Sequence, residues 1–148
     1  MTALPVNSER PLRIMAAMGP PEGEGPLLKT LGELANRSEA TLWIVHVLEP
    51  IVSQAGRREV SFENLDHAER ALMRGLERAR LESQDIRPLI LSGSVETELP
   101  SAVEMMEIDL VVLSCEPGHL PMDLLSSLSL RCPSCRLLVI PREGAQTS

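Results

Sequence analysis

The chain has 148 residues, 43% of them hydrophobic and 24% charged, which suits one globular domain with a substantial core. Its formal charge of −7 and its 1% share of aromatic residues argue against nucleic-acid binding, which needs a basic face or stacking rings. No apolar run approaches the ~20 residues that span a bilayer, and residues 1–10 lack the pattern of a signal peptide. We therefore expect a cytoplasmic protein without membrane contact.

The first third of the chain predicts a strand, a helix and a second strand. Residues 12–18 form a short apolar run that stops at a segment rich in Gly and Pro, which indicates a buried strand and a loop. Leu27 to Ala35 place apolar residues at helical spacing, with Pro26 near the first turn. Residues 40–47 are apolar and β-branched, and they predict the second strand.

The middle of the chain predicts a loop, a long helix and a third strand. Residues 51–60 are polar without a clear period, so we expect a loop there. From Ser61 to about Ser83 an apolar stripe recurs among charged residues, which predicts a helix with a solvated face. Residues 86–91 predict a strand at a sheet edge, because Pro88 cannot donate to a ladder.

Two more helices and two more strands follow. A helix is expected around residues 99–106, capped by Thr97, with Pro100 in its first turn. Residues 110–113 and 136–140 predict strands, and a helix is expected from about 121 to 131. Strands that are apolar on both faces and alternate with amphipathic helices indicate an α/β protein with a covered parallel sheet.

We expect a single domain over residues 1–148, with its core at about 12–141 and a flexible tail at 142–148. In an open α/β sheet, a loop at the carboxyl end of a strand is where ligands usually sit. A phosphate binder would place several glycines after the strand at residues 110–113, and this loop has Gly118 beside Glu116. The loop therefore lies where a nucleotide site is expected, but it lacks most of the glycines that would bind the phosphates.

Four segments together resemble the universal stress protein family in their order and spacing. They are residues 42–50, Gly93-Ser94-Val95 before a helix, residues 108–113 and residues 135–141. The resemblance implies a Rossmann-like fold with a five-stranded parallel sheet in order 3-2-1-4-5 and helices on both faces. It also implies a homodimer through the last strand, Arg136–Ile140, whose apolar edge would be exposed in a monomer.

ATP-binding members of that family carry an Asp at the end of the first strand and a Gly-x2-Gly-x9-Gly-Ser/Thr pattern after the fourth. Here the first strand ends in Ala17-Met18-Gly19, and Gly118 is the only glycine between Leu113 and Ile140. We therefore expect that ATP binding has been lost and that no cofactor is bound. If a nucleotide does bind, we expect Gly19, Gly118, His119 and Ser126 as its contacts; of these, the resemblance places Ser126 near the family's Gly-Ser position.

The charges of the predicted crevice agree with that expectation. The sheet order places the crevice between residues 19–26 and 114–121, loops that supply Glu22, Glu24 and Glu116 but no Lys or Arg. A carboxylate close to a triphosphate is repelled by roughly 1 kcal/mol per pair in water. A bridging Mg²⁺ would reverse this repulsion. The alternative function is therefore a stress protein that binds an adenine nucleotide, either AMP or ATP with Mg²⁺.

The Cys132-Pro-Ser-Cys135 motif raises a second alternative, a thiol redox protein. Reactive thiolates are usually stabilised at a helix amino terminus, whereas this pair follows a helix and meets the wrong end of its dipole. A zinc site that also used Cys115 and His119 would have to join opposite edges of the sheet, roughly 15 Å apart across a helix of ~10 residues. We therefore predict no metal site.

No spacing in the chain supports a Ser–His–Asp or paired-carboxylate arrangement, so we assign no catalytic residues. His46 lies in an apolar strand and His67 on the long helix, positions that are typical of structural or surface histidines. The sequence thus favours a non-enzymatic stress-response or regulatory binding protein. It does not identify the protein partner of such a module.

Overall fold

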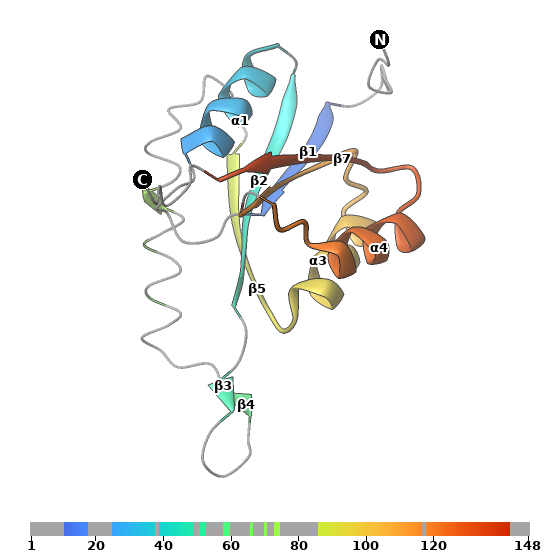
Figure 1. The fold of residues 1–148 in the computed structure, drawn as a ribbon. Helices are drawn as coiled ribbons and strands as arrows, with labels where there is room; N and C mark the ends of the chain where they lie inside the picture. Colours follow the sequence, from blue (N-terminus) through green and yellow to red (C-terminus); the bar gives the residue numbers. More distant parts are fainter. Residues whose placement is uncertain are drawn as a thin grey trace.

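A computed structural model describes residues 11–17, 25–37, 39–48, 51–52, 58–59, 66, 70, 73–74, 86–116 and 118–142. Figure 1 shows the strands and helices that they form. The strands of the main sheet are β1 (Leu12–Ala17), β2 (Ala40–Leu48), β5 (Ile86–Ser92), β6 (Leu110–Cys115) and β7 (Arg136–Pro141). The helices that flank it are α1 (Gly25–Arg37), α3 (Val95–Met105) and α4 (Met122–Arg131). In this described part, no helix is long and apolar enough to cross a membrane.

The five main strands form one parallel sheet in the order β5-β2-β1-β6-β7. Numbered along the chain, this is the predicted order 3-2-1-4-5, which is confirmed. The strand that holds Pro88 lies at an edge, as its missing N–H predicts. The other edge is β7, the last strand of the chain.

Two apolar layers hold the helices against the sheet, one on each face. Ile14 and Ala16 of β1 pack with Leu31 of α1, whereas the intervening Met15 packs with Leu99 of α3 and Leu124 of α4. Successive side chains of a strand point to opposite faces, so a central strand needs apolar residues at every position. The predicted helices on both faces are therefore confirmed (Figure 1).

The middle of the chain departs from the predicted loop. Residues 51–52 and 58–59 form a short antiparallel pair, β3 (Ile51–Val52) with β4 (Arg58–Glu59). A two-residue strand depends on backbone pairing and is too short to leave a period in the sequence. Of the predicted helix over residues 61–83, only residues 66, 70, 73 and 74 are described, all in helical conformation. The rest of that prediction lies outside the described residues.

Helix α3 begins earlier than predicted, so the assignment of Thr97 as its cap is wrong. The carbonyl of Ser94 accepts hydrogen bonds from the N–H groups of Thr97 at 3.2 Å and Glu98 at 2.8 Å. Ser94 is therefore the cap residue, directly after Gly93 with its φ of +135°. Pro100 consequently lies inside the helix rather than in its first turn, and it is buried against the core.

Arg142, the first residue of the predicted flexible tail, is hydrogen-bonded to β6. The Arg142 N–H donates to the carbonyl of Cys115 at 2.8 Å and continues the β6–β7 ladder by one step. Its side chain is only 15% exposed. Residues 143–148 lie outside the described residues, and the single-domain prediction for residues 1–148 stays a prediction.

Candidate ligand crevice at the carboxyl edge

The sheet order reverses between β1 and β6. From β1 the chain continues to β2 and β5 on one side, and later to β6 and β7 on the other. Such a reversal opens a crevice beyond the carboxyl ends of the two strands, where α/β proteins bind ligands. One wall follows Ala17, but residues 18–24 lie outside the described residues. The predicted roles of Gly19, Glu22 and Glu24 therefore cannot be placed.

The other wall is the turn after β6, which brings together two of the predicted contacts, Gly118 and His119. The His119 N–H donates to the carbonyl of Glu116 at 2.9 Å, and all three residues are exposed. Gly118 has a φ of +81°, and a Cβ there would meet no atom within 4 Å. The turn is thus an exposed loop with open space at its glycine, consistent with a wall of the crevice.

Ser126, the fourth predicted contact, lies on α4. It is an exposed residue of α4, about 6 Å along the helix from its start at Met122. A phosphate at a helix start contacts the N–H groups of the first turn, and that turn carries the Asp123 carboxylate. Ser126 therefore lies past the first turn of α4.

Arg142 is a cation at the carboxyl edge of the sheet that the sequence reasoning missed. Its Nε lies 3.7 Å from Oε1 of Glu116, whose side chain is 63% exposed. The two loops that were expected to form the crevice contain no cation, but the end of β7 supplies one. The signal was available in principle, because parallel pairing of the last strand with β6 sets Pro141 beside Cys115. The residues that follow these two are Arg142 and Glu116.

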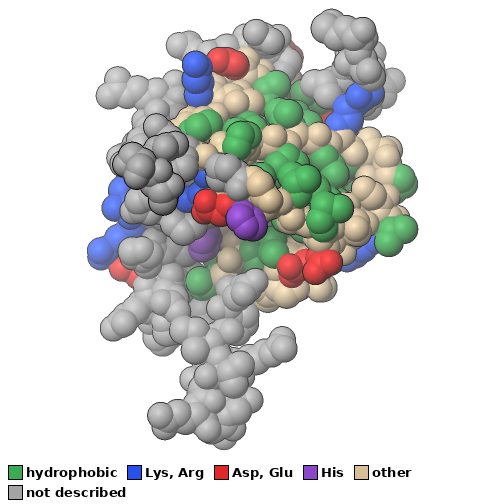
Figure 2. All heavy atoms as spheres, viewed as in Figure 1, with side chains coloured by type: hydrophobic (Ala, Val, Ile, Leu, Met, Phe, Trp, Pro, Cys, Tyr) green, Lys and Arg blue, Asp and Glu red, His purple; other side chains and the backbone are tan. Residues whose placement is uncertain are grey.

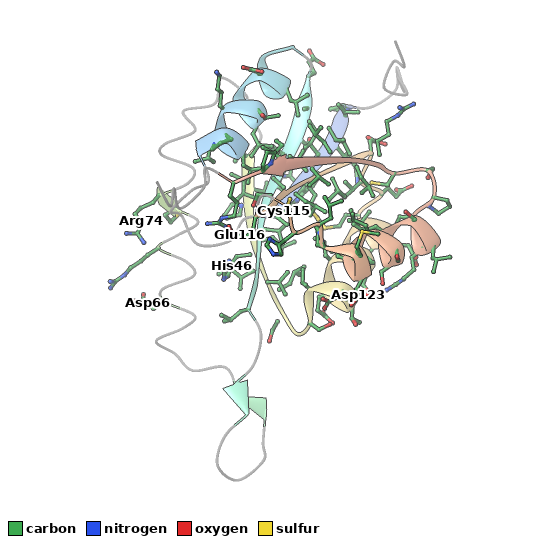
Figure 3. All side chains as sticks on the ribbon, viewed as in Figure 1. His46, Asp66, Arg74, Cys115, Glu116 and Asp123 are labelled. Atoms are coloured by element: carbon green, nitrogen blue, oxygen red, sulfur yellow. The ribbon has the colours of Figure 1, made fainter. Side chains whose placement is uncertain are left out.

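Further polar residues lie at the same edge of the sheet. Leu42 and Ile44 of β2 belong to the apolar layer of α1, so strand alternation places His46 on that face. Val112 of β6 belongs to the same layer, which places Ser114 there too. His46 is half-buried near the carboxyl end of β2, and Figure 3 shows its position together with those of Cys115 and Glu116. The edge thus offers hydrogen-bond donors and one paired guanidinium.

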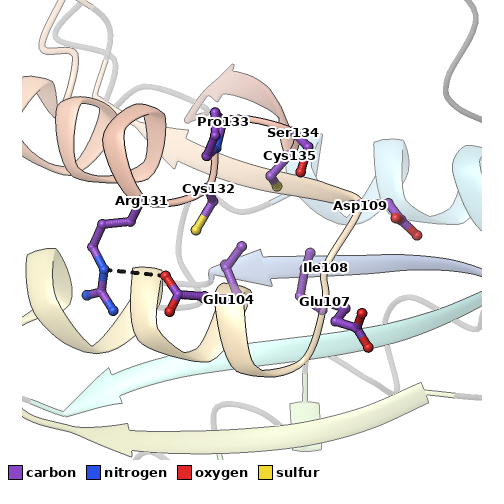
Figure 4. A pocket seen from close by; sticks show the side chains of 10 residues that line it. Glu104, Glu107, Ile108, Asp109, Arg131, Cys132, Pro133, Ser134 and Cys135 are labelled. Carbon is purple, nitrogen blue, oxygen red and sulfur yellow. Dashed lines mark ion pairs between the residues drawn. The ribbon is translucent and has the colours of Figure 1, made fainter.

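A second hollow, of about 430 Å³, lies at the amino edge of the sheet (Figure 4). It is bounded by the end of α3 and by the turn that joins α4 to β7. Its lining residues are Val103, Glu104, Glu107, Ile108, Asp109, Arg131, Cys132, Pro133, Ser134 and Cys135.

Both thiols of this hollow are protonated at neutral pH. Burial, together with the neighbouring Cys132, raises the pKa of the Cys135 thiol to about 11. Burial also raises the pKa of Cys132, with Glu104 acting in the same direction. The Cys132 Sγ donates to the carbonyl of Pro100 at 3.6 Å. Cys115 lies at the opposite edge, at the carboxyl end of β6, so the three cysteines do not converge.

Among the described residues, no group of three or more His, Cys, Asp and Glu side chains is arranged to hold a metal ion. Cys115 and His119 lie at the carboxyl edge, whereas Cys132 and Cys135 lie at the amino edge. This separation removes the four-ligand zinc site that their composition allows.

Comparison with known proteins identifies the fold and the family. The model of the universal stress protein family matches residues 12–132. Among solved structures, UspA from Lactobacillus plantarum is 16% identical, with a TM-score of 0.66 over 87% of this chain and 97% of that one. No curated protein matches this chain in sequence.

Two further solved structures contain nucleotides. The universal stress protein from Archaeoglobus fulgidus, in complex with dAMP, is 15% identical, with a TM-score of 0.61 over 87% of this chain and 97% of that one. A family member from Arabidopsis thaliana with AMP bound is 15% identical, with a TM-score of 0.56 over 93% and 96% of the two chains. At these identities the likeness establishes the fold alone.

Proposed function

Since this chain belongs to the universal stress protein family, we propose that it is a non-enzymatic stress-response or regulatory binding protein that has lost ATP binding. One observation carries the proposal. The turn after β6 holds one glycine, Gly118, between Glu116 and His119, where ATP-binding relatives have a glycine pattern. A triphosphate wrapped by this turn would meet a carboxylate instead of a series of backbone N–H groups.

The ion pair of Glu116 with Arg142 supports the same conclusion. The guanidinium of Arg142, at the end of β7, lies within 3.7 Å of the carboxylate. A phosphate group that paired with Arg142 would displace the Glu116 carboxylate. The negative charge of that carboxylate would then lie next to the negatively charged phosphate. The crevice therefore gains little net attraction for a polyanion.

Isothermal titration of the full chain with ATP and Mg²⁺ tests this proposal. We expect no binding at micromolar concentrations, because the glycine pattern is missing and Glu116 opposes the phosphates. Micromolar affinity would overturn the proposed loss of ATP binding. AMP is titrated in parallel, because it carries fewer negative charges than ATP and is repelled less by the Glu116 carboxylate.

Binding of AMP, or of ATP with Mg²⁺, remains the alternative function, and two features favour it. The solved relatives described above hold dAMP and AMP, and the space at Gly118 allows a ligand to approach the backbone. If this alternative holds, Glu116→Gln tightens AMP binding by up to about tenfold, because a repulsive charge is removed. Arg142→Gln weakens it by a similar factor.

The second alternative, a redox protein that uses Cys132 and Cys135, has less support. Thiol–disulfide exchange proceeds through a thiolate, and the raised pKa values of both thiols leave little of it at neutral pH. Counting free thiols before and after mild oxidation tests this alternative. It fails if Cys132 and Cys135 form no reversible intramolecular disulfide.

We also propose that the protein acts in the cytoplasm as a homodimer formed through β7. This strand is an edge of the sheet, and unpaired strand edges favour pairing with another chain. Figure 2 shows hydrophobic side chains gathered on the face that β7 and α4 present. The exposed large hydrophobic residues include Leu120, Met122 and Leu138. A second copy of the chain would cover part of this surface.

A further inference from the structure

The two thiols at the amino edge are held close together by a tight turn. The Cys135 N–H donates to the carbonyl of Cys132 at 3.0 Å, so these are the first and fourth residues of a β-turn. Such a turn keeps the two Cα atoms within about 7 Å. Both side chains line the hollow beside α3, and Figure 4 shows both thiols on the side of the turn that faces this helix. The turn therefore brings two thiols to the lining of one hollow, where the Cys132 Sγ donates to the carbonyl of Pro100 at 3.6 Å and the Cys135 Sγ to that of Arg136 at 3.4 Å.

The charges that line the hollow attract free cations, although Glu104 and Asp109 also oppose ionisation of the thiols. Glu104, Glu107 and Asp109 line the hollow, against one guanidinium, that of Arg131. The Arg131 Nε lies 3.8 Å from Oε2 of Glu104, so its charge is already matched. A hollow lined mostly by carboxylates raises the local concentration of cations and repels anions.

The number of ligating side chains in the hollow limits which metal ions can bind there. Zinc sites require four ligands, or three with an open position. Among the described residues, no three or more side chains of His, Cys, Asp or Glu are arranged to hold a metal ion. Soft thiolates without further ligands select soft metal ions, of which Cu(I) is the common biological example.

We propose that Cys132 and Cys135 bind one soft monovalent metal ion of the Cu(I) class in a two-coordinate site. On binding, two S–H bonds break and two sulfur–metal bonds form. Two protons pass to solvent, and neither the metal nor the sulfurs change oxidation state. The site is independent of the carboxyl-edge crevice and of any function proposed there.

Titration of the reduced full-length protein with Ag(I), under argon in chloride-free buffer, tests this site. Native mass spectrometry counts the bound ions, and competition with a small thiol measures the affinity. We expect one Ag(I) per chain, bound at least about 10–100-fold more weakly by Cys132→Ser and by Cys135→Ser. Cys115→Ser is the matched control, because its thiol lies at the opposite edge, and it should bind as the wild type does.

Three results would overturn the proposal. Wild-type affinity in both Cys132→Ser and Cys135→Ser excludes these thiols, and an equal loss in Cys115→Ser points to non-specific binding. Zn(II) binding as tight as that of Ag(I) indicates a site with more ligands. Since Cys132 is buried, folding of its variant is checked first by the fluorescence of Trp43, which lies in the same core layer. If that variant does not fold, the half-buried Cys135 carries the comparison.

Discussion

Arg142 is the residue that most changes the electrostatic picture of the crevice. Its pairing with Glu116 involves a carboxylate that is 63% exposed, so the ion pair itself contributes at most about 1 kcal/mol to stability. Its importance lies in position rather than in strength. It places a cation at the end of β7, next to the turn that holds Gly118 and His119. Any anionic ligand at this edge would compete with Glu116 for the guanidinium.

The protonation of Cys135 leads to a prediction at the scale of one side chain. Folding raises the pKa of its thiol from 9.0 to about 11, chiefly through burial. At pH 8 the folded chain therefore holds roughly 100-fold less Cys135 thiolate than the unfolded chain. We expect iodoacetamide to alkylate Cys135 about 100-fold more slowly in native protein than in urea. Peptide mass spectrometry after timed quenching measures both rates, and equal rates would contradict the prediction.

The same shift sets the sign of a stability effect. Between pH 9 and 11 the unfolded state releases the Cys135 proton, whereas the folded state keeps it. The stabilising contribution of the neutral thiol is complete below pH 9 and is lost as the pH rises through 11. A Cys135→Ala variant should lack this part of the alkaline decline.

At the scale of elements, α3 ends in a Schellman motif that contains an unusual residue. The Ile108 N–H donates to the carbonyl of Val103 at 3.0 Å, and the Glu107 N–H to that of Glu104 at 3.3 Å. Glu107 has a φ of +52°, a left-handed conformation that glycine normally supplies at this position. Its carboxylate also lies at the negative end of the helix dipole. The helix therefore ends by the usual hydrogen bonds but with a strained backbone at Glu107.

Replacing this residue should stabilise the protein. We expect Glu107→Gly to raise the free energy of unfolding by about 1 kcal/mol, because the left-handed strain is removed. Glu104→Gly, inside the same helix, is the matched control and should lower it by about 1 kcal/mol. Urea denaturation followed by Trp43 fluorescence measures both. A loss of stability in Glu107→Gly would show that its side chain makes a compensating contact.

The elements also differ in how well the sequence predicts them. The central strands were predicted correctly because burial on both faces leaves an uninterrupted apolar run. The start of α3 was not, because its signal is the local conformation of Gly93 and Ser94 rather than the apolar stripe. The β3–β4 pair also escaped prediction, since its short strands show no period. Prediction succeeded where many residues carry one signal and failed where one or two residues decide.

At the scale of the whole molecule, the free edge of β7 determines how two copies would pair. The N–H groups of Arg136 and Arg142 donate to carbonyls of Asp109 and Cys115, towards β6. Strand alternation therefore turns the N–H groups of Leu137 and Val139 away from β6, to the outer edge. The N–H of Leu138 faces β6 with those of its even-numbered neighbours.

This alternation allows the dimer to be tested separately from the fold. Val139→Pro removes an outward N–H and should convert the dimer to a folded monomer, because the β6 ladder keeps its own bonds. Leu138→Pro is the control, and it should cost about 3 kcal/mol of stability by breaking that ladder. Light scattering measures the oligomeric state of the Val139→Pro variant, and urea denaturation measures the stability of both variants. A Val139→Pro dimer, or a wild-type monomer at high micromolar concentration, would contradict pairing through β7.

The sequence by itself determined the fold class, the strand order expected from the family resemblance, and the edge position of the strand with Pro88. These features depend on patterns that repeat over many residues, which local propensity and burial make visible in one dimension. Only the tertiary structure showed that Arg142 pairs with Glu116 and that Cys132 and Cys135 line a common hollow. Each of these contacts joins segments that are far apart in the sequence. The direction of the side chains at such contacts is determined by packing across the sheet rather than by neighbouring residues in the chain.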